Sequence, residues 1–135
     1  MKISKANWKI NSKKINFHDD TIETLLYDQE KKRIIIHCFD NNKQNNQYEL
    51  HFHNVIGFKM SACVFWGCPE YILDCEIMSD DNAILILELK NEWKKVPQVI
   101  SLPNYNNLIE ILFTLTSGDK LRIACESFEI IRKTD

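Results

Sequence analysis

Three histidines that the strand alternation places on one face are the residues of this chain that most directly suggest chemistry. His37 lies in one alternating segment, and His51 and His53 lie in a second one together with Glu49. Neutral imidazoles gathered on one face of a sheet are suitable zinc ligands, and imidazoles also gain charge between about pH 5 and 7. We keep a metal- or small-ligand-binding module on this histidine-rich face as the alternative hypothesis. The leading hypothesis below includes no metal and no cofactor.

The segment Phe17-His18-Asp19-Asp20 places a histidine beside a carboxylate, as a catalytic dyad would. Adjacent residues of an extended chain point to opposite sides, which separates His18 from Asp19. None of the serines stands in the G-x-S-x-G pattern of a nucleophile elbow. The segment therefore favours a turn in which Phe17 enters the core and Asp19 or Asp20 bonds backbone amides. We expect a protein that is not an enzyme.

Acidic residues are concentrated between positions 70 and 92, where Lys90 is the one basic residue. An acidic patch of this kind speeds association with a basic protein and adds specificity. We take Glu76, Asp80 and Asp81 as partner contacts, and Trp66 as an aromatic anchor at the same interface. The competing interpretation is a solvated strand edge that deters aggregation.

Glycine usage and net charge exclude several classes of protein. The three glycines, at 57, 67 and 118, are too far apart for a dinucleotide fingerprint or a P-loop. The net charge of −2 argues against a globally basic nucleic-acid binder. The longest apolar run, residues 83–87, is too short to span a bilayer. We expect neither a nucleic-acid nor a membrane partner.

The cysteines favour a reducing compartment. Their number, five, is odd, and no pair forms C-x-x-C. The chain also shows no secretory signal. We expect reduced thiols, with Cys38, Cys75 and Cys125 buried as small hydrophobic residues, and a cytoplasmic location.

The length of 135 residues suits a single domain. Residues 1–14 contain five lysines and no acid, and we treat them as a basic N-terminal segment that is either mobile or an edge element. Residues 15–135 form the single β domain. Its oligomeric state is left open.

A hairpin is predicted around the polar stretch 40–47. Residues 33–39 and 48–53 alternate between apolar and polar side chains, which is typical of half-buried strands. Pairing Phe39 with Gln47 puts all the buried candidates on one face, and a slip of one residue would mix the two faces. The predicted inward set is Ile34, Ile36, Cys38, Tyr48, Leu50 and Phe52, and the opposite face carries the histidines.

A second hairpin is predicted near the C-terminus, between residues 109–115 and 121–125. Burial favours an odd-numbered loop that sets Leu115 opposite Leu121 and Phe113 opposite Ile123. Gly118 or Asp119 then supplies the positive φ of the turn.

The remaining segments complete a mainly β architecture. Residues 55–66 and 71–77 are predicted strands, and residues 83–89 are predicted to be a strand covered on both faces. Residues 20–29 fit either a capped helix or a strand, and we favour the strand. The prediction is an antiparallel β-sandwich or strongly curved sheet of seven to nine strands with little helix.

The chain resembles a loose group of small uncharacterised bacterial all-β proteins. These proteins begin with a Phe/Trp-His-Asp element, here Phe17-His18-Asp19, and close with a strand–Ser-Gly-Asp–strand hairpin, here residues 115–123. Asp20 stands where the group often has Ser. Some members are suspected immunity proteins of contact-dependent toxin systems. The resemblance implies a protein-binding domain that inhibits a bacterial toxin, and it implies no catalytic residues.

Overall fold

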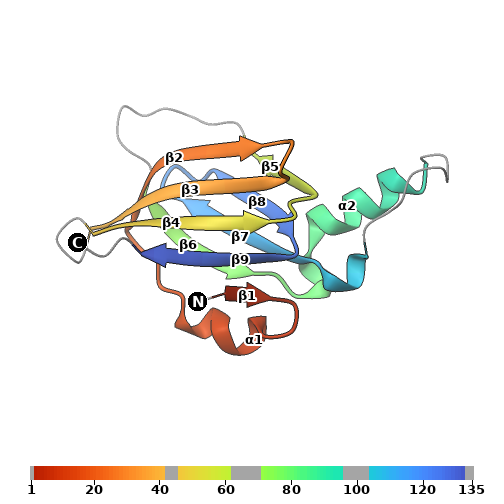
Figure 1. Cartoon of the computed structure of the whole chain (residues 1–135), viewed down its shortest axis with the longest axis horizontal. Coiled ribbons are helices and arrows are strands. Elements are labelled where there is room, and N and C mark those ends of the chain that lie inside the picture. The colour runs from red at the N-terminus through yellow and green to blue at the C-terminus, as the bar shows by residue number, and fades with distance from the viewer. Residues whose placement is uncertain (1, 42–45, 62–70, 96–103, 133–135) are drawn as a thin grey trace.

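Two antiparallel sheets make up most of the computed structural model, which describes residues 2–41, 46–61, 71–95 and 104–132 (Figure 1). The first sheet has the strand order β1-β9-β4-β3-β2, and the second has the order β5-β8-β7-β6. The described strands are β1 (Lys2–Ser4), β2 (Thr21–Asp28), β3 (Arg33–Asp40), β4 (Asn46–His53), β5 (Gly57–Met60), β6 (Ile72–Ile77), β7 (Ile109–Leu115), β8 (Lys120–Cys125) and β9 (Ser127–Arg132). The mainly β, sandwich-like prediction is confirmed.

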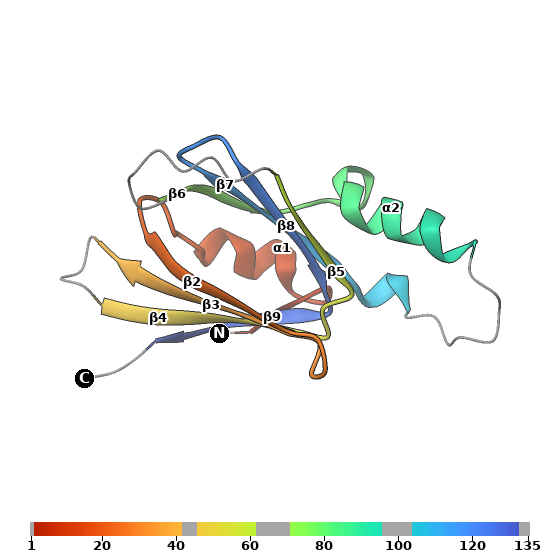
Figure 2. The same ribbon diagram turned by 90° about the horizontal axis from the view of Figure 1, so that it is seen from above.

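Helical structure is limited to short pieces in the described part of the chain. The α-helices are α1 (Trp8–Asn11) and α2 (Ile84–Trp93), and the 3₁₀ turns are η1 (Ser12–Lys14), η2 (Asp80–Asn82) and η3 (Tyr105–Asn107). Figure 2 shows the two sheets as separate layers, with α2 extending beyond one end of the four-stranded sheet. None of the described helices is long and apolar enough to cross a bilayer.

The β3–β4 hairpin has the predicted register, with Phe39 paired to Gln47. Because side chains alternate along a strand, this register turns one face of both strands toward the second sheet. The inward set is buried as predicted: Ile34, Ile36, Cys38, Tyr48, Leu50 and Phe52. Hydrophobic burial therefore selects the pairing, as the alternation indicates.

Aromatic contacts join the two layers in the core. Phe52 of β4 meets Phe113 of β7 edge to face, with ring centroids 6.2 Å apart, and stacks on Phe128 of β9 at 5.2 Å. Both arrangements are preferred geometries for aromatic pairs. The three fully buried rings link strands from both sheets.

The β7–β8 hairpin has the predicted face but a different register. Phe113 pairs with Leu121, and not with Ile123. The loop is tighter than the predicted pairing of Leu115 with Leu121 requires, because the Leu115 N–H donates to the Asp119 carbonyl at 2.9 Å. Gly118 has φ of 89°, so it supplies the positive φ that the turn requires. The register shift of two residues keeps the same faces, so the predicted inward residues of both strands still lie in the main core: Ile109, Ile111, Phe113, Leu115, Leu121, Ile123 and Cys125.

The predicted strand at residues 83–89 is wrong, because these residues begin helix α2. A short run that is apolar on every side fits a buried strand and a buried helix equally well. In the structure, Leu85 and Ile86 pack on Leu108 and Ala124, at the outer face of the four-stranded sheet. The Ile86 N–H donates to the carboxylate of the buried Glu110 at 2.9 Å, which satisfies one of the free amides of the first helical turn.

Residues 21–28 form strand β2, as favoured, with a bulge between Ile22 and Thr24. Within the basic N-terminal segment, β1 pairs with β9 at the end of the five-stranded sheet. Ile3 of β1 is fully buried in the main core. This part of the basic segment is therefore an edge element.

The turn from Phe17 to Asp20 connects the two sheets. The Asp19 N–H donates to the carbonyl of Ile72 in β6, and the Ile72 N–H donates to the Asp20 carbonyl, both at 2.8 Å. The Tyr48 hydroxyl donates to the buried Asp20 carboxylate at 2.5 Å, and the Tyr48 ring stacks on Phe17. We call these contacts of residues 17–20 the inter-sheet clamp.

Burial affects the titration of several groups in the core. It raises the pKa of Asp20, although the hydrogen bond from Tyr48 partly offsets this effect. It raises the pKa of Cys38 to about 12, and it also raises the pKa values of the thiols of Cys75 and Cys125. All three are free cysteines: Cys38 and Cys125 are buried, and Cys75 is half-buried. They stay protonated at neutral pH, where a thiol is a poor nucleophile.

Gly118→Ala is expected to lower the free energy of unfolding by about 1 kcal/mol, because a β-carbon disfavours the left-handed backbone. A β-carbon at this position would meet no atom within 4 Å, so the cost is conformational and not steric. Gly118→Asn should cost less, since asparagine tolerates this region. Urea unfolding of the three proteins measures the order Gly, Asn, Ala, and an alanine variant as stable as the natural protein would contradict it.

Candidate functional site

The predicted acidic contacts do not form one patch. Glu76 lies on β6, whereas Asp80 and Asp81 lie in η2, after the strand has ended. Asp80 forms a short ion pair with Lys5, which follows β1. This hydrogen bond and the nearby positive charge lower the pKa of Asp80. Asp81 is exposed. Trp66 lies outside the described residues, so its predicted role as an anchor stays a prediction.

Glu76 instead has a carboxylate neighbour on its own strand. Asp74 and Glu76 pair with Thr114 and Leu112 of β7 and share the outer face of the four-stranded sheet. The hydrogen bond between the two side chains and their mutual repulsion raise the pKa of Glu76. Glu76 is therefore protonated more readily than an isolated glutamate.

Exposed apolar side chains accompany the acids along β6. Tyr71 precedes the strand and is 37% exposed, and Leu73 lies at the β-bulge and is 48% exposed. We call the group Tyr71, Leu73, Asp74 and Glu76 the β6 edge surface. It combines an aromatic ring, an aliphatic side chain and two carboxylates on the outermost strand of its sheet.

The backbone along the first half of this edge is already bonded. A ring nitrogen of His18, Nδ1, lies 2.8 Å from the Leu73 carbonyl. Because a carbonyl can only accept, Nδ1 must carry the proton. His18 Nε2 lies 3.5 Å from the Asp19 carboxylate, so the prediction that these neighbours point apart is wrong. The reason is that Asp19 has φ of 68° and is not extended. The turn itself is as the sequence favours, with Phe17 buried in the core, but the contact of His18 with the β6 backbone was not predicted.

The three histidines lie on the outer face of the five-stranded sheet, as the register predicted. The Glu49 carboxylate lies between His51 Nε2, at 2.7 Å, and His37 Nδ1, at 3.4 Å. His53 Nε2 lies 2.7 Å from Glu129 of β9, and this hydrogen bond lowers the pKa of Glu129. Within the described residues, no group of three or more His, Cys, Asp or Glu side chains is arranged to hold a metal ion. Each imidazole is instead close to a carboxylate.

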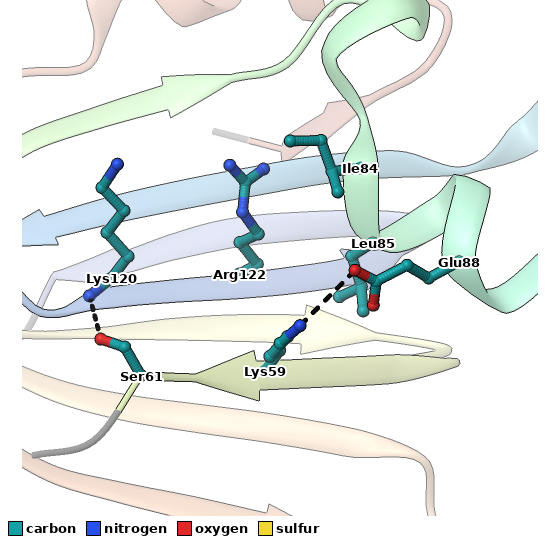
Figure 3. A pocket seen from close by; sticks show the side chains of 7 residues that line it. All are labelled: Lys59, Ser61, Ile84, Leu85, Glu88, Lys120 and Arg122. Atoms are coloured by element: carbon teal, nitrogen blue, oxygen red, sulfur yellow. Dashed lines mark hydrogen bonds and ion pairs between the residues drawn. The ribbon is translucent and has the colours of Figure 1, made fainter.

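A groove that the sequence did not predict lies between α2 and strands β5 and β8 (Figure 3). Its volume is about 160 Å³. The residues that line it are Lys59, Ser61, Ile84, Leu85, Glu88, Lys120 and Arg122. We call it the helix-walled groove. Lys120 and Arg122 stand two residues apart, which is the only local sign of it, because the rest depends on the pairing of β5 with β8 and on the position of α2.

Comparison with known proteins supports the fold alone. No protein-family model matches the chain, and no curated protein matches it. A crystal structure of an uncharacterized protein from Neisseria gonorrhoeae is similar, with a TM-score of 0.51 and 12% sequence identity over 96% of each chain. The similar fold carries no function to transfer.

Asp74→Asn is expected to lower the pKa of Glu76 toward its ordinary value of 4.5, because the hydrogen bond with the Asp74 carboxylate and its repelling charge are both removed. A raised pKa in the folded state means that stability falls as the pH rises through it, and the variant should show less of this fall. NMR titration of the carboxyl carbon measures the pKa. Asp81→Asn is the control, and an unchanged Glu76 pKa in Asp74→Asn would contradict the coupling.

Proposed function

We propose that this chain is a non-enzymatic protein-binding domain whose partner places a basic surface on the β6 edge surface. The specific form that we propose, suggested by the sequence resemblance, is an immunity-type inhibitor of a bacterial toxin. The observation that carries the proposal is the pairing of exposed Tyr71 and Leu73 with the acids Asp74 and Glu76 on one edge strand.

The electrostatics of Asp74 and Glu76 favour a cationic partner. Their repulsion makes the free protein less stable whenever both are ionised. A lysine or arginine from a partner would replace this repulsion with attraction. Complementary charge of this kind raises the association rate and selects against acidic surfaces.

Tyr71 and Leu73, the apolar residues of the β6 edge surface, would slow the dissociation of the complex. Aromatic and aliphatic side chains at the centre of an interface contribute most of the binding free energy, and charges at the rim contribute less. The edge backbone near Ile72 and Leu73 is already bonded by residues 18–20. A partner would therefore contact side chains there, and would not add a strand to the sheet.

The proposed contacts differ from those expected from the sequence. Glu76 remains, and Asp81 becomes an exposed acid beyond the end of the strand. Asp80 is already neutralised by Lys5, so it contributes less attraction to a basic partner.

The double variant Asp74→Lys with Glu76→Lys should slow association with the partner by about tenfold at low salt, and the difference should shrink at high salt. The partner to test is the product of the gene beside the gene for this protein, where that gene encodes a secreted toxin. Stopped-flow fluorescence or biolayer interferometry gives the association rate at each salt concentration.

The matched control is Glu23→Lys with Glu30→Lys, because these two acids are exposed on the β2 side of the other sheet. It changes the net charge by the same amount. Equal association rates for the two double variants would refute the role of the β6 edge surface. A neighbouring toxin that does not bind this chain at all would refute the immunity-type function.

A further inference from the structure

We propose that the helix-walled groove binds the oxyanion group of a small organic acid, a carboxylate or phosphate attached to a short apolar chain. This site lies at the opposite edge of the four-stranded sheet from β6, near the other edge strand β5. The proposal is independent of the basic partner proposed for the β6 edge surface.

The sheet register gathers three cations at the groove. Lys120 and Arg122 are two residues apart on β8, so their side chains leave the same face of the strand. Figure 3 shows the two side chains extending from β8 toward the same side. Lys59 of β5 pairs directly with Arg122 across the strands. Like charges placed opposite each other repel, so an added anion would relieve this arrangement.

The carboxylates near the groove do not compensate for all three cations. Glu110 neutralises Arg122, and its carboxylate lies 2.6 Å from Arg122 Nη1. Glu88 of α2 lies 3.5 Å from Lys59 Nζ, in an exposed and loose ion pair. Lys120 Nζ has neither a hydrogen-bond acceptor nor a carboxylate partner among the described residues. One positive charge therefore remains for a ligand.

Arg122 is held in place as a donor. Its side chain is 16% exposed, and Glu110, which is fully buried, receives both the Arg122 guanidinium and the Ile86 N–H. A guanidinium has five N–H donors, and this ion pair occupies one end of it. Arg122 lines the groove, and its remaining donors need not be ordered when a ligand arrives, which lowers the cost of binding.

The apolar residues that line the groove favour an anion with an apolar chain. Ile84 and Leu85 of α2 line one side of the groove, and Ile84 is 49% exposed. Ser61 is already engaged, since its hydroxyl donates to Asp119 and accepts the Lys120 N–H. The groove is smaller than the roughly 300–1,000 Å³ of sites for drug-sized molecules, so it suits one acidic group with a short apolar chain.

Binding can be measured by NMR titration of the ¹⁵N-labelled full chain at constant ionic strength. The probes are hexanoate, hexyl phosphate and inorganic phosphate. We expect saturable shifts at the amides of Lys59, Lys120 and Arg122 with at least one hexyl probe, and weaker binding of inorganic phosphate. The tighter of the two hexyl probes identifies the source of the oxyanion as a carboxylate or a phosphate.

Two variants separate the charge from the apolar wall. Lys120→Gln should weaken the hexyl probes by about tenfold, the loss expected for one charged hydrogen bond. Lys95→Gln, an exposed lysine just after α2, is the matched control and should change nothing. Ile84→Ser should weaken the hexyl probes and leave inorganic phosphate unchanged.

Three results would overturn the proposal. The first is the absence of saturable shifts with any probe. The second is equal binding to Lys120→Gln and Lys95→Gln, which would indicate general attraction of anions to the surface. The third is that inorganic phosphate binds as tightly as the hexyl probes, which would show that the apolar wall contributes nothing to binding.

Discussion

The inter-sheet clamp, in which Asp20 is bonded through its backbone to β6 and through its carboxylate to β4, is the contact on which the rest of the structure depends. Burying a carboxylate is costly unless it is hydrogen-bonded, and the Tyr48 hydroxyl meets this need. The exchange of hydrogen bonds with Ile72 places β6 against the end of the other sheet. These bonds add to the core packing of the fully buried Ile72 and fix the position of the strand that carries the acids of β6.

The outer face of the four-stranded sheet changes charge from one edge to the other. One row of paired residues runs from Glu76 through Leu112 and Arg122 to Lys59. Neighbouring strands lie about 4.8 Å apart, so the three steps of this row separate an acidic edge from a basic groove by about 14 Å. The two proposed sites are thus opposite ends of one surface. Helix α2 covers the adjoining row, where Ala124 and Gly57 pair.

Local patterns predicted the elements whose two faces differ strongly. The β3–β4 hairpin was predicted to the residue, because a slip of one position would move Ile36 and Leu50 from the core into water. The same reasoning fixed the faces of β7 and β8 but not their register, since the loop closed by the bond between Leu115 and Asp119 keeps the same parity. Helix α2 was predicted as a strand because residues 83–87 are apolar on every side and alternation gives no signal there.

Contacts between distant residues explain what the sequence did not predict about the sites. Asp80 was expected to contact a partner, but it is bonded to Lys5, which is 75 residues away in the chain. The helix-walled groove needs β5 beside β8 and α2 above both. The histidine face was predicted correctly as a group because one hairpin contains all three rings, whereas Glu129 reaches His53 from a strand that lies 76 residues further on.

Hydrogen exchange at the Ile72 amide tests the inter-sheet clamp most directly, because this amide donates to the Asp20 carbonyl. If the clamp holds the sheets together, Ile72 should exchange with the same opening free energy as the core amides of β3 and β7, through global unfolding. Exchange as fast as that of the amide of Glu30, an exposed residue of the β2–β3 turn, would show that the clamp opens by itself and would contradict the account.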